Sequence, residues 1–388
     1  MHSGKAVFAQ LMEWVHPEQF RRCVTRYRGN YKARNFSCWD QFLAMAFAQI
    51  TFRESLADIE ICLRSRREQL YHLGFRSSVA RSTLADANGS RDWRIYADLA
   101  QGLIGRARRL YAQEPLGIEL DQVVYALDST TIDLCLSLFP WARFRATKAA
   151  IKLHTLLDLR GPIPTMVAIS EGKRADVRVL DELIPEPGAF YVMDRGYVDF
   201  GRLYRFVLAS AFFVTRTKAG IRLNRLESRP VDRSTGLRSD HVVWLANPQS
   251  ASHYPDRLRR VSYRDPEDGK LLVFLTNNLD LPALVIAMLY KLRWRVEIFF
   301  KWIKQNLRIK HFFGTSDNAV KTQVWIAVCV YVLVAIVRKE LRLELTLSQI
   351  LQILSVNAFE QVPLAQLVAK TESRNEPLGE HKQLMLWD

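Results

Sequence analysis

The stretch VVYALDSTT, residues Val123–Thr131, carries most of the information about the fold, and AFYVMDRGY, residues Ala189–Tyr197, repeats its pattern. Each stretch begins as a short apolar run and reaches an aspartate, Asp128 in the first and Asp194 in the second. Such a run predicts a buried strand, so each carboxylate is expected at a strand end, at the rim of a sheet. Taken alone, either aspartate also fits a turn or a helix cap, where Asp is common.

The segments around these runs predict a regular order of elements. A Gly-Pro turn at 160–162 joins two apolar runs and predicts an antiparallel hairpin. The order is three strands, helix, strand, helix, strand. Besides the two aspartate strands, the elements are the hairpin strands 151–158 and 163–170, helices at 176–184 and about 200–208, and a strand at 211–216.

Further along the chain, residues 289–304 (LYKLRWRVEIFFKWIK) predict a helix with one polar stripe. At about 100° per residue, Arg293, Glu297 and Lys304 lie at about 300°, 340° and 320° from Tyr290, and Lys301 lies at about 20°. The adjacent apolar face is formed by Leu292, Val296, Phe299 and Ile303. A carboxylate among cations on an anchored helix suggests a metal ligand beside phosphate-binding groups. The plainer interpretation is i,i+4 pairing on a solvated helix face.

The spacing Y-x2-R-x3-E-x6-K of this stripe, with the DST and DRGY contexts of the two aspartates, resembles the signature of the insertion sequence 4 family of bacterial DDE transposases. The resemblance covers about residues 30–345. It implies an α/β fold with an RNase H-like catalytic core, a mixed five-stranded sheet with flanking helices. Asp128 is then expected on the first strand, Asp194 after the fourth and Glu297 on a later helix, converging at one rim of the sheet.

The chemistry that the resemblance implies is metal-dependent cleavage of DNA. Asp128, Asp194 and Glu297 are the implied catalytic residues and metal ligands, with Asp128 bridging two Mg²⁺ ions about 3.5–4 Å apart. Carboxylates suit this hard cation, and Mn²⁺ is expected to substitute. Phosphates of the DNA are expected to contact the phenolic and cationic members of the stripe, Tyr290, Arg293, Lys304 and Lys301.

The composition agrees with a nucleic-acid partner. The chain has 388 residues, is 49% hydrophobic and carries a net charge of +15 with a pI of about 9.7. Its five cysteines form no CxxC pair, which is typical of reduced thiols. The first twenty residues show no secretory pattern, so we expect a cytoplasmic, nucleoid-associated protein. The uncharged run 324–337 is shorter than the roughly 20 residues of a spanning helix and predicts a buried helix on one face of the sheet.

The N-terminal part, residues 1–115, is expected to be a helical DNA-binding domain. Helices are predicted from a capping box at 37–40 to about residue 50, and at 55–63, 76–88 and 92–110, with a turn at 88–90. The spacing permits a helix-turn-helix in which Arg81, Ser82 and Thr83 contact DNA. A basic helical bundle without groove insertion fits equally well. The region also resembles the N-terminal domain often joined to this transposase type, which reads terminal inverted repeats.

The remaining segments complete the expected domain organisation. Residues 116–217 and 275–345 form the catalytic domain, residues 218–274 a β-rich insertion, and residues 346–388 a C-terminal helical segment that either contacts a second copy or caps the core. Strands are expected in the insertion at 241–245 and 260–263, with another at 271–276. Trp244 is the candidate to occupy the space of a flipped base beside the cut, since base flipping needs a stacking group. Alternatively, Trp244 packs on one face of the insertion.

The expected function is cut-and-paste transposition by an insertion sequence transposase that binds terminal inverted repeats and target DNA, as a homodimer on two element ends. Hydrolysis exposes a 3′-OH, which then attacks target DNA. One alternative is an RNase H-like nuclease without strand transfer, and the other is an inactive DNA-binding regulator.

Overall fold

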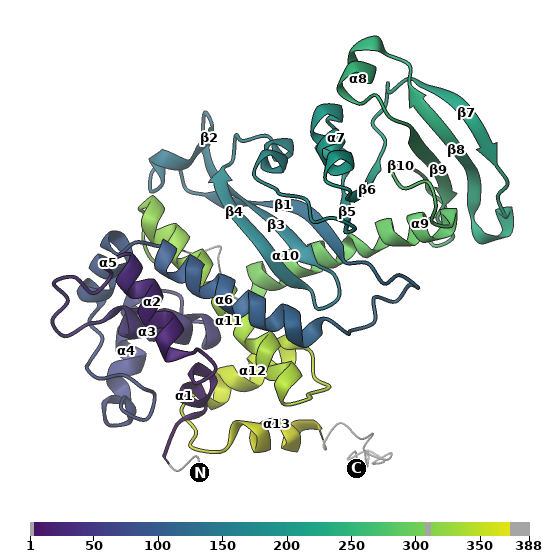
Figure 1. Ribbon diagram of the computed structural model, residues 1–388. Helices are drawn as coiled ribbons and strands as arrows, with labels where there is room; N and C mark the ends of the chain where they lie inside the picture. Colours follow the sequence, from purple (N-terminus) through teal and green to yellow (C-terminus); the bar gives the residue numbers. More distant parts are fainter. Residues whose placement is uncertain (1–3, 307–311, 373–388) are drawn as a thin grey trace, which may run out of the picture. The chain divides into compact units, whose positions relative to one another are not determined.

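The structure is a computed structural model that describes residues 4–306 and 312–372 (Figure 1). Its contacts divide into two units. The first, here called the helical unit, comprises residues 1–110 and 302–388, and the second, the sheet unit, comprises residues 111–301. All strands of the described residues lie in the sheet unit.

The sheet unit is built on one ten-stranded sheet of order β2-β3-β1-β5-β6-β10-β9-β8-β7, in which β4 also pairs with β3. β5 runs parallel to both β1 and β6, and the other pairs are antiparallel. The strands are β1 (Val124–Leu134), β2 (Arg143–Arg145), β3 (Lys148–Asp158), β4 (Ile163–Glu171), β5 (Phe190–Met193), β6 (Phe212–Arg216), β7 (Leu223–Arg229), β8 (Leu237–Leu245), β9 (Leu258–Arg264) and β10 (Leu271–Thr276).

The predicted strand order is present, but the sheet is larger than the five strands expected. Strands β4, β3, β1, β5 and β6 are the five predicted ones, and β10 extends the sheet because it pairs with β6 over Val214–Arg216. β7 was not predicted, since its sequence LNRLESR is mostly exposed and lacks an apolar alternation. The insertion strands therefore continue the sheet that carries both aspartates.

One face of this sheet is covered by η3 (Asp176–Asp181), η4 (Arg195–Tyr197) and α7 (Phe200–Leu208). Their apolar side chains pack with those of β1, β5 and β6 in a core that includes Leu127, Met193, Leu203 and Phe213. The helix expected over 176–184 is a 3₁₀ helix that ends at Asp181. The sequence Ile184-Pro185 also disfavours helix at residue 184, because a residue before proline avoids the helical region.

The polar stripe lies on two consecutive helices and not on one. α9 (Ala283–Leu292) ends before Arg293, and α10 (Trp294–Asn306) begins after it. Around Arg293 the backbone bonds are the tighter i→i+3 type, from Arg293 N to Tyr290 O and from Val296 N to Arg293 O. Arg293 itself has helical backbone angles, so α9 and α10 follow one another without a break in helical conformation between Tyr290 and Glu297.

The helical unit confirms most of the predicted helices. Ser37 and Asp40 form the expected capping box of α3, and Ser55 caps α4. The helices of this unit are α1 (Val7–Met12), α2 (Pro17–Arg26), α3 (Cys38–Ile50), α4 (Leu56–Ser65), η1 (Arg67–Gln69), α5 (Arg81–Ser90), α6 (Arg94–Tyr111), α11 (Asp317–Glu340), α12 (Leu347–Asn357) and α13 (Leu364–Glu372).

The predicted helix-turn-helix is not formed. Residues 66–80 separate α4 from α5, whereas the motif uses a turn of about 3–4 residues. α5 begins at Arg81 and not at residue 76, because Ala80 has extended backbone angles, and it continues through the turn expected at 88–90. Arg81, Ser82 and Thr83 form its exposed first turn.

Helix α11 is the one helix of the described residues that is long and apolar enough to span a membrane, and 94% of its most apolar window is buried. The helices that pack on it are α3, α5 and α12 of the same unit, so α11 belongs to the helical unit and not, as expected, to the unit that contains the sheet. The C-terminal helices pack inside the unit as well, since α12 and α13 both contact α1.

Candidate active site

The two predicted aspartates are side by side because of the register between two parallel strands. Leu127 of β1 is the partner of Met193 of β5, and each is followed directly by an aspartate, Asp128 or Asp194. Neighbouring strands lie about 4.8 Å apart, so the two carboxylates leave the sheet at nearly the same point. The hydroxyl of Thr215 on β6 donates to the carbonyl oxygen of Asp194 at 3.2 Å and ties the third strand to this point.

Arg293 links the third predicted carboxylate to the first. One guanidinium nitrogen donates to Asp128 Oδ2 at 2.6 Å, and the other donates to Glu297 Oε1 at 2.6 Å. The Arg293 side chain is 15% exposed, against 19% for Asp128 and 34% for Glu297. The Arg293 guanidinium therefore joins Glu297 to Asp128, which is far away in the sequence. The interpretation as an i,i+4 pair on a solvated helix face does not account for this second contact.

Tyr290 connects the same group to Asp194. Its hydroxyl donates to Asp194 Oδ1 at 3.2 Å, and the Arg293 guanidinium lies 5.6 Å from its ring centroid. Phe274 of β10 packs against the ring, with a centroid distance of 4.8 Å. Burial raises the pKa of Tyr290 to about 12, so the phenol stays protonated and acts as a donor.

Burial dominates the electrostatics of Asp128. It raises the pKa of this carboxyl to about 6, even though Arg293 and the backbone N–H of Ser129 act to lower it. The negative charges of Glu297 and Asp194 contribute to the rise. The three carboxylates thus share one electrostatic environment in which a further cation would be favourable.

The donor set fits a hard divalent cation in kind, since three carboxylates supply only oxygen ligands. Within residues 4–306 and 312–372, no three His, Cys, Asp or Glu side chains stand close enough together to hold a metal ion as they are. Arg293 occupies the position between Asp128 and Glu297. An ion shared by these carboxylates therefore requires the guanidinium to move.

A second polar cluster next to Asp128 escaped the sequence analysis. The Ser129 hydroxyl donates to Asp176 Oδ1 at 2.8 Å, and Lys152 Nζ donates to the same oxygen at 3.0 Å. His154, the register partner of Ser129, is fully buried and shares a hydrogen bond of 2.9 Å with Ser170. Burial lowers the pKa of His154 to about 4, so it is neutral. Asp176 lies in the 3₁₀ helix η3, far in sequence from Ser129, so no local sequence pattern predicted this cluster. The pairing of Ser129 with His154 in the strand register is the feature that could have pointed to it.

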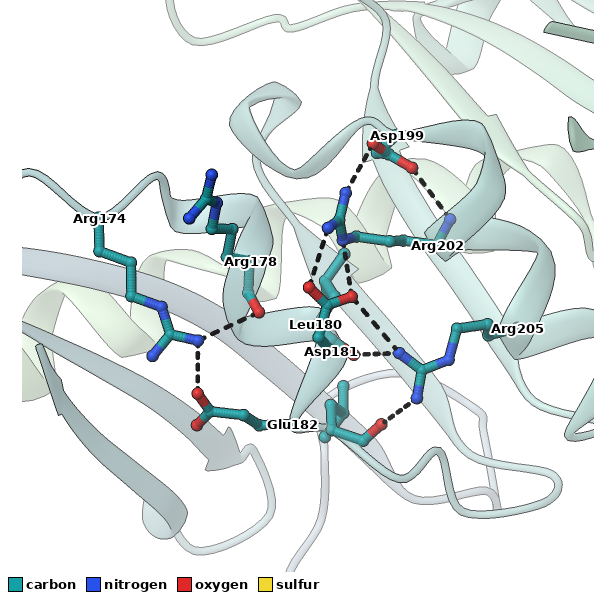
Figure 2. A network of polar contacts seen from close by, with 9 residues as sticks. Arg174, Arg178, Leu180, Asp181, Glu182, Asp199, Arg202 and Arg205 are labelled. Carbon is teal, nitrogen blue, oxygen red and sulfur yellow. Dashed lines mark hydrogen bonds and ion pairs between the residues drawn. The ribbon is translucent and has the colours of Figure 1, made fainter.

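Figure 2 shows how arginine side chains link η3 to α7. Arg202 of α7 binds Asp181 of η3 through two nitrogens, both at 2.9 Å, and Asp199 through a third at 2.8 Å. Arg205 donates to the carbonyl of Leu180 at 2.8 Å. The network fixes η3 against α7, and so it fixes the helix that carries Asp176.

The other predicted site residues lie elsewhere on the two units. Lys301 is exposed on α10, and Lys304 follows within the helical unit. Trp244 on β8 is 52% exposed, so it does not pack in a core. Four strand-to-strand steps separate β8 from β5, which is about 19 Å across the strands at about 4.8 Å each. The register also sets Trp244 level with Phe190, four residues before Asp194, so Trp244 and Asp194 are further apart than that. Arg81, Ser82 and Thr83 belong to the helical unit.

Comparisons with known proteins identify the family of this chain. Residues 119–333 match the family model described as "Transposase DDE domain", and residues 3–76 match a "Domain of unknown function (DUF4372)". The chain is 31% identical over 292 residues to "Putative transposase y4zB" of Sinorhizobium fredii, covering 74% of this chain and 80% of that protein.

Two further relatives belong to insertion sequences. The "Probable transposase for insertion sequence element IS5377" of Geobacillus stearothermophilus is 35% identical over 53% of this chain and 54% of its own length. "Transposase InsG for insertion sequence element IS4" of Escherichia coli is 24% identical over 47% of this chain and 43% of its own length.

Proposed function

This chain belongs to the family of bacterial DDE transposases of the insertion sequence 4 type, and we propose that it cuts and joins DNA at the cluster of Asp128, Asp194 and Glu297. The single observation that carries this proposal is the convergence of three sequence-distant carboxylates. The register of β1 and β5 sets two of them side by side, and Arg293 bonds the first to Glu297.

We infer that the sheet unit contains an RNase H-like core. The five strands β4-β3-β1-β5-β6, with β5 parallel to both of its neighbours, support this inference. In such a core, the catalytic carboxylates belong on the first strand, after the fourth strand and on a later helix. Asp128 lies within β1, Asp194 directly follows β5 and Glu297 lies on α10, which supports the proposal.

The cofactor proposed is a pair of Mg²⁺ ions, with Mn²⁺ as a substitute, held by Asp128, Asp194 and Glu297. When bound, such ions stabilise the charge on the attacking and leaving oxygens of a phosphodiester. Asp128 would hold a cation favourably, because burial and then the charges of Glu297 and Asp194 raise its pKa, and a bound cation would offset both effects.

The reaction proposed has two displacements at phosphorus. In the first, a water oxygen attacks the phosphorus at the element end, and the bond to the 3′ oxygen breaks, leaving a 3′-OH and a 5′-phosphate. In the second, that 3′-OH attacks a phosphorus of target DNA, its proton goes to solvent, and a target 3′-OH is released.

The residues of the stripe hold the DNA in this scheme. Arg293, once released from Asp128, presents a planar guanidinium for bidentate contact with a phosphate. Lys304 and Lys301 add point charges along the backbone, and the Tyr290 hydroxyl orients Asp194 from 3.2 Å. A homodimer would supply one such site to each element end, in the bacterial cytoplasm, where the DNA is found.

The helical unit is proposed to recognise the inverted repeats, with Arg81, Ser82 and Thr83 exposed on the first turn of α5. Trp244, exposed on β8, is proposed to stack on a base at a distance from the cut.

The test is cleavage of a labelled linear fragment that carries the inverted repeats flanking the gene, with Mg²⁺ or Mn²⁺. We expect nicking at the repeat by the wild type and joined products with target DNA, no cleavage by Asp128→Ala or Glu297→Gln, and DNA binding by all three. Asp133→Asn is the matched control, since Asp133 lies on the same strand and is exposed. Cleavage without joined products would favour a nuclease, and binding without cleavage under every metal would favour an inactive regulator.

A further inference from the structure

The loop that joins α2 to α3 in the helical unit (Figure 1) concentrates positive charge without compensation. Residues 27–36 read YRGNYKARNF, and Arg28, Lys32 and Arg34 are all exposed. Among the residues that the structure describes, none of the three has an acidic side chain within ion-pair distance, although the structure contains many such pairs elsewhere. Three cations within seven positions therefore face solvent together.

Two carboxylates near this loop, Asp98 and Asp92, are paired with other arginines. Asp98 accepts from Arg26 and from the Tyr27 hydroxyl, and Asp92 binds the guanidinium of Arg94 at 2.6 Å. Asp86 is the one further acid that lines the adjoining hollow. Local acids thus leave the three loop cations available for an external anion.

Fixed contacts hold the loop in place at its end. The Asn30 side chain accepts from the backbone N–H of Cys38 at 2.7 Å, and the Ser77 hydroxyl donates to the Asn35 carbonyl at 3.1 Å. Arg91 donates to the Ser37 carbonyl at 2.7 Å, and its guanidinium lies 5.4 Å from the Phe36 ring centroid. A loop held this way keeps its charges in one arrangement and loses little entropy on binding.

Two of the three cations sit on unusual backbone. Arg28 has φ of 50° and Lys32 has φ of 60°, in the left-handed region that non-glycine residues rarely adopt. Such conformations persist where the surroundings impose them, and they gather at binding sites.

The loop and α5 enclose a hollow of about 570 Å³, lined by loop residues and by Thr83, Ala87 and Ser90 of α5. The start of α5 carries no capping side chain, because its N-cap residue is Ala80. The first-turn N–H groups of the helix therefore add a partial positive charge to the same surface. Tyr31, 73% exposed, stands between the cations.

We propose that Arg28, Lys32 and Arg34, together with the first turn of α5, bind the phosphodiester backbone of double-stranded DNA. This inference rests on the proposed function. It assigns the loop contacts to the DNA backbone, in place of a recognition helix inserted into a groove. Uncompensated cations at fixed spacing match a polyanion of regular charge, and the exposed hydroxyls of Ser82 and Thr83 are further phosphate donors.

The experiment measures the salt dependence of DNA binding by fluorescence anisotropy, in EDTA so that no cleavage occurs. The variant is Arg28→Gln, Lys32→Gln and Arg34→Gln in the full chain. Each lost phosphate contact lowers the slope of log K against log salt by about 0.9, so we expect the slope to fall by about 2–3. The matched control is Arg22→Gln, Arg64→Gln and Arg67→Gln, three exposed arginines outside the loop with the same change in charge.

A charge-preserving variant, Arg28→Lys, Lys32→Arg and Arg34→Lys, is expected to keep the wild-type slope. It distinguishes a loss of charge from a loss of folding as the cause of a lower slope. An unchanged slope in the glutamine variant, an equal fall in the control, or a fall with single-stranded but not double-stranded DNA would overturn the inference. If the wild type binds and cleaves element ends while the glutamine variant keeps its slope, only this inference fails. If the wild type never cleaves, the proposed function fails independently of the binding data.

Discussion

Replacing Asp128 with asparagine is expected to stabilise the folded protein at alkaline pH while abolishing its chemistry. Burial raises the pKa of Asp128 to about 6 from the 3.8 of an unperturbed aspartate. The side chain is 19% exposed, so solvent screens little of this effect. The difference between the two pKa values corresponds to about 3 kcal/mol of unfolding free energy, lost when the buried carboxyl is ionised.

The sign follows from the direction of the shift. Because the folded pKa lies above the unfolded one, the contribution of Asp128 to stability is fully present below pH 3.8 and is lost as pH rises through 6. Asparagine resembles the protonated carboxyl at every pH. The variant should therefore equal the wild type near pH 4 and exceed its unfolding free energy by about 3 kcal/mol at pH 8.

The assay is urea unfolding in EDTA at pH 4, 6 and 8, followed by the fluorescence of the nine tryptophans. Asp133→Asn, an exposed change on the same strand, should shift stability by less than about 0.5 kcal/mol at all three values. A variant that is less stable than the wild type at pH 8, or a difference that does not change with pH, would refute the reasoning. Added Mg²⁺ should stabilise the wild type and not Asp128→Asn.

Three other predictions follow from the same geometry. Tyr290→Phe removes the donor to Asp194 and should slow single-turnover cleavage about tenfold with unchanged DNA binding; an equal rate would make that hydrogen bond irrelevant. His154 has a pKa of about 4 against 6.5 when unfolded, so its contribution is present above pH 6.5 and lost as pH falls towards 4; His154→Gln should flatten this loss, about 3 kcal/mol, in urea unfolding. Trp244→Ala should leave the melting temperature within about 2 °C, because the side chain is exposed. In DNA footprinting it should reduce protection at positions away from the scissile phosphate. Loss of protection at the cut itself would contradict the estimate from strand spacing.

The site was predictable where local patterns determine geometry. An apolar run followed by an aspartate predicted a strand end at both sites. This was correct for Asp194, which directly follows β5, and wrong for Asp128, because β1 continues past it to Leu134. The helical repeat placed Tyr290, Arg293 and Glu297 on one stripe, and the structure links two of these directly to the aspartates. Both predictions depend on spacings of a few residues.

Contacts between distant segments were not predictable in this way. The bond from Arg293 to Asp128 and the bond from Ser129 to Asp176 depend on tertiary packing, which no periodicity encodes. The start of α5 was missed because residues 76–80 have helical composition but an extended Ala80. Burial of α11 was visible in its sequence, whereas its helical partners were not, since an apolar run looks the same beneath a sheet or between helices.

The hydrogen bonds between β6 and β10 have a mechanical consequence. They make strands β7–β10 one continuous plate with the strands that carry Asp128 and Asp194, so that this part of the sheet cannot swing on a hinge without breaking the ladder. Trp244 and Asp194 therefore keep a fixed separation within this sheet. If both residues contact DNA, as proposed, any mismatch between this separation and the element end has to be absorbed by bending or unstacking the DNA.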